Sequence, residues 1–204
     1  MRQKLRKIDG LILGEHYHLN EEDECFYLGE YTAGMGYAHS ETNQLISNFK
    51  KCPSRVNTAE WKHKLLAIKY VSDILRGIIP KDILTSSTLV PIPPSKSKVD
   101  PLYDERMTAM LNELTNGLNS DIRELLVLSE SINASHLSTT RHSPDELYNL
   151  MQLDQSLADP TPQTIILFDD MITAGAHFRA CKRILSGAFP QARILGVFIA
   201  RRAV

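Results

Sequence analysis

Hydrophobic and polar residues follow two different periods along this chain, and together they predict a mixed α/β protein. Short apolar runs typical of buried strands occupy residues 87–91, 123–128, 164–168 and 194–200. Segments with apolar residues at every third or fourth position are typical of helices with one buried face, and they occupy residues 57–78, 102–118, 145–151 and 176–188. Because strands alternate with helices, we expect a mostly parallel sheet flanked by helices on both faces.

Capping residues predict where two of these helices begin. Asn57 and Glu60 are a suitable capping pair for the first long helix, which Pro80 ends. Asp100 and Pro101 suit the N-cap and the first position of the next helix. A long polar stretch without periodicity, residues 129–144, predicts a surface loop.

The N-terminal part of the chain predicts a small β appendage. Residues 9–14 and 24–37 are rich in aromatic and β-branched types and contain glycine breaks. We therefore expect an appendage or hood over residues 1–55 and an α/β core over residues 56–204. Three tyrosines of this segment either form a wall that stacks a flat base or simply cover the sheet; they are Tyr27, Tyr31 and Tyr37.

Composition excludes several classes of protein. The chain has 204 residues, 43% hydrophobic and 23% charged, as expected for one globular domain with an addition. A formal net charge of −1 argues against binding nucleic acid through general electrostatics. Three scattered cysteines without a Cys-x-x-Cys pair fit a reducing compartment, and no apolar run is long enough to cross a bilayer. We expect a cytoplasmic protein without a membrane partner.

Residues 164–177 carry the strongest chemical signal. An apolar strand leads directly into Asp169 and Asp170, and a small turn that contains Gly175 precedes a helix. The amides of such a turn and the positive end of the helix dipole suit a phosphate group. The two carboxylates can accept hydrogen bonds from a vicinal diol. The pattern therefore indicates a site for a ribose 5-phosphate.

Three other interpretations of this segment remain open. Strand-loop-helix units with a glycine in the turn often bind nothing. A haloacid dehalogenase-like site also places acids after a strand, but that chemistry uses Asp-x-Asp, whereas Asp169 and Asp170 are adjacent. A receiver-like acidic pair belongs to the first strand of its domain, and these acids lie near the end of the chain.

The segment resembles the PRPP-binding motif of type I phosphoribosyltransferases, in which four apolar residues precede Asp-Asp and a Thr/Gly-rich loop. The resemblance implies that Asp169 and Asp170 bind the ribose hydroxyls, directly or through Mg²⁺ that arrives largely with the substrate. It also implies a 5′-phosphate cradle made of Thr173, Ala174, Gly175, Ala176 and His177. The family usually has Thr or Ser at the last of these positions, so His177 is a departure.

A phosphoribosyl site also needs cations for pyrophosphate and a cover that excludes water. The loop that follows the strand at 87–91 offers a pyrophosphate clamp made of Ser95, Lys96, Ser97 and Lys98, or else an ordinary solvated loop. The 129–144 loop suits a lid. Within the lid we expect Arg141, ahead of His136 and His142, to assist departure of pyrophosphate, because its charge is fixed.

Outside the motif, three stretches resemble ComF-type phosphoribosyltransferase-like proteins: residues 39–51, where an apolar helix ends in Lys, residues 89–107, with a VPxP loop, and residues 136–154. The chain lacks the four-cysteine zinc ribbon of competence-type members, and its VPxP loop has Lys where they commonly have Arg. Proteins of this general kind also occur as accessory components of phage-defence systems, including some retrons.

The resemblance implies a PRPP-binding protein that carries out Mg²⁺-dependent transfer, or hydrolysis, at ribose C1 with release of pyrophosphate. Asp169, Asp170 and Arg141 are the expected catalytic residues. The alternative is a regulatory or accessory subunit that senses PRPP or a nucleotide without turnover, for example in a phage-defence system of the retron type. A homodimer or a complex with a protein partner is compatible with either, and a nucleic-acid partner is suggested only by the ComF likeness and by Arg201 and Arg202.

Overall fold

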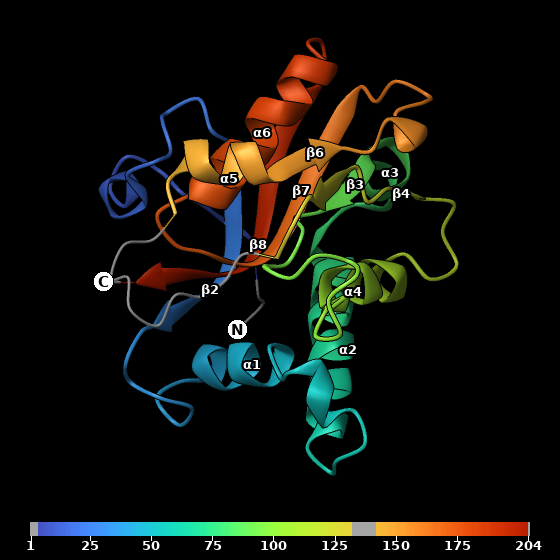
Figure 1. Ribbon diagram of the computed structural model, residues 1–204. Coiled ribbons are helices and arrows are strands. Elements are labelled where there is room, and N and C mark those ends of the chain that lie inside the picture. The colour runs from blue at the N-terminus through green and yellow to red at the C-terminus, as the bar shows by residue number, and fades with distance from the viewer. Residues whose placement is uncertain (1–3, 132–141, 204) are drawn as a thin grey trace.

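A six-stranded sheet forms the centre of the molecule (Figure 1). The computed structural model describes residues 4–131 and 142–203. The strand order is β1-β2-β8-β7-β3-β4, and all neighbouring pairs are parallel except β1 with β2. The strands are β1 (Arg6–Lys7), β2 (Cys25–Thr32), β3 (Thr88–Pro91), β4 (Asp121–Ile122), β7 (Thr164–Ile172) and β8 (Arg193–Ala203). The expected α/β sheet is confirmed in this coarse form.

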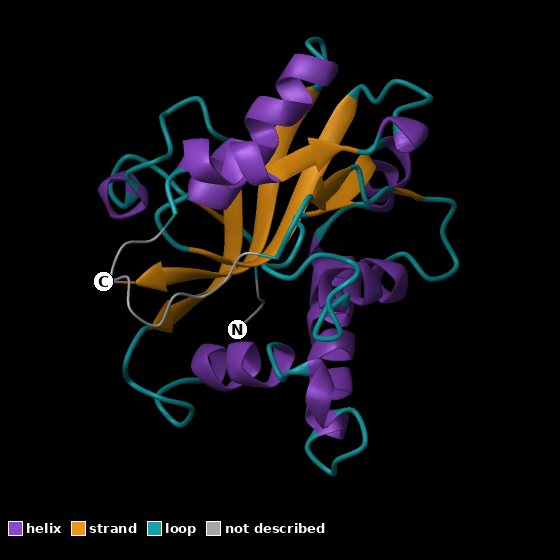
Figure 2. Cartoon of the chain, in the orientation of Figure 1, coloured by secondary structure: helices purple, strands orange, loops and turns teal. Residues whose placement is uncertain are grey.

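Helices cover both faces of the sheet (Figure 2). One face packs against α1 (Glu41–Phe49), α2 (Trp61–Ile78) and α4 (Arg106–Leu114), and the other against α5 (Pro144–Leu150) and α6 (Ala176–Ala188). The side chains of β7 divide between the two cores, since Ile166 and Phe168 face the first layer while Ile165 and Leu167 face the second. This two-sided burial explains why the strand is apolar without interruption.

Smaller elements complete the chain. The strands β5 (Leu126–Leu128) and β6 (Met151–Leu153) form a separate antiparallel pair. The remaining helices are α3 (Lys81–Ser86) and the single turns η1 (Leu13–His16), η2 (Pro53–Arg55) and η3 (Gln155–Leu157). Within the described residues, no helix combines the length and the apolar character that crossing a membrane requires.

The two predicted helix starts are wrong, although the helices exist. The carboxylate of Asp100 accepts the Leu102 amide at 2.8 Å, which forms a local turn, and α4 begins only at Arg106. Likewise α2 begins at Trp61, after an N-cap residue whose side chain makes no capping bond. At Asp100 the cause is that a polar residue before an apolar stripe can close a turn instead of a helix.

The expected N-terminal appendage needs a correction. Strand β2 lies inside the main sheet, where Tyr27 pairs in register with Phe198 of β8. Residues 9–14 form a turn and the start of η1, not a strand. Tyr27 is buried, and the guanidinium groups of Arg6 and Arg201 lie over its ring, so its side chain packs in the core beside the sheet.

The order of the strands singles out one edge of the sheet. From β3 the chain crosses through α4 to β4 on one side, whereas from β7 it crosses through α6 to β8 on the other. These two connections cover opposite faces of the sheet. Such a reversal opens a crevice at the carboxyl ends of the two strands, and open α/β sheets bind their ligands there.

Candidate functional site

The acidic pair lies at this reversal because β7 is longer than its neighbour β3. Pro91 at the end of β3 pairs with Phe168, while β7 continues to Ile172 alongside β8. Asp169 and Asp170 therefore lie beyond the end of β3 but still within a strand. Because successive side chains of a strand point to opposite faces, the two carboxylates do not face the same way.

Asp170 is held by two cations from distant parts of the chain. It is only 2% exposed, and its Oδ1 lies 2.8 Å from Nζ of Lys50. Its Oδ2 accepts a hydrogen bond from Nε of Arg106 at 2.8 Å and forms an ion pair with Nη2 of the same side chain at 2.6 Å. Burial by itself would raise the pKa of Asp170, but Arg106 and Lys50 outweigh it, so the pKa lies below its ordinary value. Asp170 is thus an ionised, paired carboxylate.

A buried charge network continues behind Arg106. Its Nη1 donates to Oδ2 of Asp104 at 2.8 Å. Asp104 in turn accepts from Nζ of Lys64, which lies 2.6 Å from both carboxylate oxygens and is itself only 2% exposed. The network joins α2, α4 and β7, and its three cations face two carboxylates, Asp104 and Asp170. It therefore carries one positive charge in excess.

Asp169 has a different environment from its neighbour. Its Oδ1 accepts the amide of Asp170 at 2.7 Å. Burial raises the pKa of Asp169, and the negative charge of Asp170 raises it further. Among the ion pairs of the described residues, none involves Asp169. Asp169 can therefore accept hydrogen bonds from a bound hydroxyl, and it can also carry a proton more readily than an ordinary aspartate.

The turn after β7 is shaped by Gly175 and by the N-terminal segment. Gly175 has φ +94°, a left-handed conformation, and it is the N-cap of α6 without a side-chain cap. The carbonyl of Thr173 contacts Nδ1 of the buried His16, and the carbonyl of Ala174 accepts the His18 amide at 2.9 Å. The carbonyls of the turn thus bind the protein, while the first amides of α6 keep their capacity for an anion.

His177, in the first turn of α6, is neutral at physiological pH. Burial lowers its pKa to about 4, and this effect outweighs the attraction of Asp170. A neutral imidazole can donate one hydrogen bond but brings no positive charge. The structure therefore places His177 in the turn, as expected, with a role limited to that of a neutral donor.

The predicted pyrophosphate loop, residues 95–98, is engaged with its own surroundings. Nζ of Lys96 lies 3.4 Å from Oδ2 of Asp100, and Lys98 forms an ion pair with Glu124. The amide of Ser97 donates to Oγ of Ser131 at 3.1 Å, and Ser95 precedes this tied segment. Both lysines are therefore already neutralised by carboxylates.

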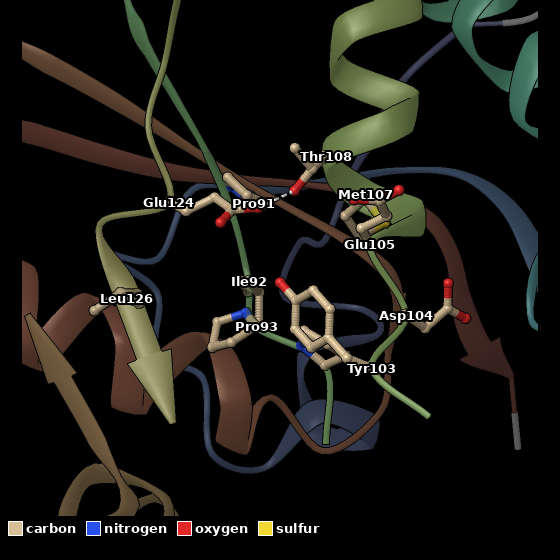
Figure 3. Close-up of a pocket in the computed structure, with 11 residues that line it drawn as sticks. Pro91, Ile92, Pro93, Tyr103, Asp104, Glu105, Met107, Thr108, Glu124 and Leu126 are labelled. Carbon is tan, nitrogen blue, oxygen red and sulfur yellow. Dashed lines mark hydrogen bonds between the residues drawn. The ribbon is translucent and has the colours of Figure 1, made fainter. Parts of the chain in front are cut away.

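A small cleft lies at the carboxyl end of β3, between the strand and the start of α4 (Figure 3). Its lining includes Pro91, Pro93, Tyr103, Asp104, Met107 and Glu124. Asp104 connects this cleft to Arg106 and through it to Asp170. The cleft and the acidic pair thus belong to one edge of the sheet.

The tertiary structure adds residues that the sequence analysis did not select. Lys50, Arg106 and His16 contact the acidic pair or its turn directly, Asp104 does so through Arg106, and Lys64 through Asp104 and Arg106. A signal existed for three of them, since Lys50, Asp104 and Arg106 fall inside the stretches for which the sequence analysis gives a ComF-type resemblance. Arg141, the residue that we expect to assist departure of pyrophosphate from the lid, lies outside the described residues, as does His136.

Neither a cluster of metal ligands among the described residues nor a similar protein indicates a function for this site. Among residues 4–131 and 142–203, no group of three or more His, Cys, Asp or Glu side chains is arranged to hold a metal ion. No protein-family model matches the chain, and no curated protein matches it. The case for a function therefore depends on the geometry at the end of β7.

Proposed function

We propose that the protein binds PRPP or a similar ribosyl phosphate at the carboxyl end of β7 and promotes Mg²⁺-dependent transfer or hydrolysis at ribose C1, with release of pyrophosphate. One observation carries the proposal. A carboxylate that makes no ion pair with any other described residue, Asp169, and a helix without a side-chain N-cap that starts at a left-handed glycine, Gly175, follow one strand at the reversal of strand order. This arrangement offers acceptors for a diol and donors for a phosphate within one short segment.

The proposed roles differ between the two acids. Asp169 accepts hydrogen bonds from the ribose hydroxyls, because its carboxylate keeps free acceptor sites. Asp170 acts as a positioning residue that fixes Lys50 and Arg106 at the site. The amides from Thr173 to His177 and the dipole of α6 hold the 5′-phosphate.

The fit of Mg²⁺ to these residues is limited to one carboxylate. Asp169 suits a single ligand, whereas both oxygens of Asp170 already face cations. Mg²⁺ commonly takes one or two carboxylates and otherwise keeps water and substrate phosphate oxygens. When bound with the substrate it neutralises charge on the departing pyrophosphate. The protein then supplies orientation through Asp169 and the turn.

The ion pairs of Asp170 with Lys50 and Arg106 also favour the second candidate function, a PRPP-sensing subunit without turnover. A carboxylate that is fully ion-paired adds rigidity but no acid–base chemistry. Transfer and sensing share the binding step and differ only in pyrophosphate release. An accessory subunit of a phage-defence system would fit the sensing alternative.

The test compares two isosteric variants by calorimetry with ribose 5-phosphate and PRPP in Mg²⁺. Asp169→Asn should weaken binding of both ligands at least tenfold and leave the free energy of unfolding unchanged or higher, because a like charge beside Asp170 is removed. Asp170→Asn should destabilise the fold by about 3–5 kcal/mol, because it removes the buried charge that compensates Lys50 and Arg106. Unchanged affinity in a folded Asp169→Asn variant would refute the proposal.

A second measurement separates the two candidate functions. The parent protein is incubated with PRPP and Mg²⁺, first alone and then with purine and pyrimidine bases, and pyrophosphate is quantified. Release that requires a base indicates a transferase, and release without one indicates a hydrolase. Binding without any release indicates the sensing subunit.

A further inference from the structure

We infer that Lys50, supported by Arg106, binds a second anionic group of the ligand, the diphosphate that a PRPP-type molecule carries at C1. This inference depends on the proposed function and gives the cation role to α1 and α4 instead of to the loop with Lys96 and Lys98. The argument rests on where the two cations lie, on what already binds them and on the charge of their surroundings.

Lys50 is held at the site by its position after α1. It is the C-cap of that helix, and its amide bonds to Ile46, while the preceding Phe49 is fully buried. From this anchored position its Nζ reaches Asp170, 2.8 Å away on β7. The side chain of Lys50 is 37% exposed, so a ligand that approaches from solvent can contact it.

Neither cation needs to leave Asp170 in order to bind an anion. An ammonium group has three donors, and Nζ of Lys50 directs one of them to Asp170. A guanidinium has five donors, and each nitrogen of Arg106 makes contact with Asp104 or Asp170, which leaves N–H groups on the two terminal nitrogens. The carboxylates therefore hold the cations in place for the ligand.

The local charge favours an anion. Three cations, Lys50, Lys64 and Arg106, face two carboxylates in the network, and Lys64 is sealed in the interior. Asp169 beside the network offsets this excess only in part, because its pKa is raised to about 7, and the remaining positive charge lies on the solvent side, at Lys50. The loop lysines differ in this respect, because Lys96 and Lys98 each have a carboxylate partner of their own.

The experiment measures binding of inorganic pyrophosphate, PRPP and ribose 5-phosphate to the full chain by calorimetry in Mg²⁺. Lys50→Met keeps the aliphatic stem and removes the charge. It should weaken pyrophosphate and PRPP about tenfold, the expected effect of losing one partly exposed charge-assisted hydrogen bond, and change ribose 5-phosphate less than twofold. Lys50→Arg should restore most of the loss.

Two further variants make the comparison specific. Lys69→Met, on the exposed side of α2, is the matched control and should leave all three affinities unchanged. Lys98→Met tests the rival loop. A loss of pyrophosphate binding in Lys98→Met with none in Lys50→Met would overturn the inference, as would a parent protein that fails to bind pyrophosphate at millimolar concentration.

The ligands also distinguish this inference from the proposed function. If the parent binds pyrophosphate through Lys50 but does not bind ribose 5-phosphate, the sugar-phosphate proposal fails and the anion site stands. If ribose 5-phosphate binds and Lys50→Met leaves PRPP affinity intact while thermal unfolding shows a folded variant, the anion site fails and the proposed function stands.

Discussion

Gly175 lies directly against Leu19, a residue 156 positions earlier in the chain: a Cβ atom at Gly175 would come within 2.7 Å of Cδ2 of Leu19. The contact fixes the turn between β7 and α6 against the N-terminal segment. The same segment also binds the carbonyls of Thr173 and Ala174 through His16 and His18. The proposed phosphate cradle is therefore shaped from both ends of the sequence.

Gly175→Ala should destabilise the protein by about 2–4 kcal/mol. The substitution places a side chain at φ +94°, which costs about 1–2 kcal/mol, and it forces Leu19 to move. Chemical denaturation measures the free energy of unfolding. Gly187→Ala is the matched control, because it lies in the same helix with open space around its Cβ.

The control should change the free energy of unfolding in the opposite direction. Alanine is favoured over glycine in a helix by about 0.5–1 kcal/mol, so Gly187→Ala should stabilise the protein slightly. If both substitutions had equal effects, the left-handed turn and its contact with Leu19 would have no special role.

Asp104→Ala should cost about 3–5 kcal/mol of unfolding free energy. The change leaves Lys64, whose Nζ lies 2.6 Å from both oxygens of Asp104, with a buried charge that is poorly compensated. Burial already lowers the pKa of Lys64, in opposition to the hydrogen bonds that Lys64 donates to Asp104. Denaturation at neutral pH measures the loss.

A double variant separates the charge from the packing. Lys64→Met combined with Asp104→Leu removes both charges and should be closer to the parent in stability than Asp104→Ala alone. A double variant that is as unstable as the single one would mean that packing, and not an unpaired charge, causes the loss.

His177→Thr should reduce the loss of stability between pH 6.5 and pH 4. The folded-state pKa of His177 is about 4, below its ordinary value of 6.5, so the unfolded chain takes up a proton first as the pH falls. The contribution of His177 is therefore complete above pH 6.5 and declines by up to about 1.4 kcal/mol per pH unit down to pH 4.

The comparison with the parent matters because other groups titrate in this range. His16 also has a lowered pKa, caused mainly by burial, and acts in the same direction, whereas the raised pKa of Asp169 acts in the opposite one. Both remain in the variant, so the difference between the two stability–pH curves isolates His177. Parallel curves from pH 4 to 6.5 would contradict the prediction.

The local pattern of apolar and polar residues was sufficient to predict several strands and helices. The strand that contains Ile165 to Phe168, the helix at 176–188 and the parallel α/β sheet are all present as expected. Helix starts at Asp100 and Asn57 were wrong; at Asp100 the side chain closes a local turn, which competes with helix capping. Predicted ligand roles for Lys96, Lys98 and Arg141 stay predictions.

The amino-acid sequence by itself determined that two adjacent acids follow a buried strand and precede a glycine turn and a helix. These are short-range features, set by apolar period and by the backbone freedom of glycine. Only the tertiary structure decided that Asp170 is paired with Lys50 and Arg106, whereas Asp169 makes no ion pair in the part of the chain that the structure describes. The physical reason is that strand order and crossover connections bring residues 50, 106 and 170 together, and no local pattern encodes which distant cation meets which carboxylate.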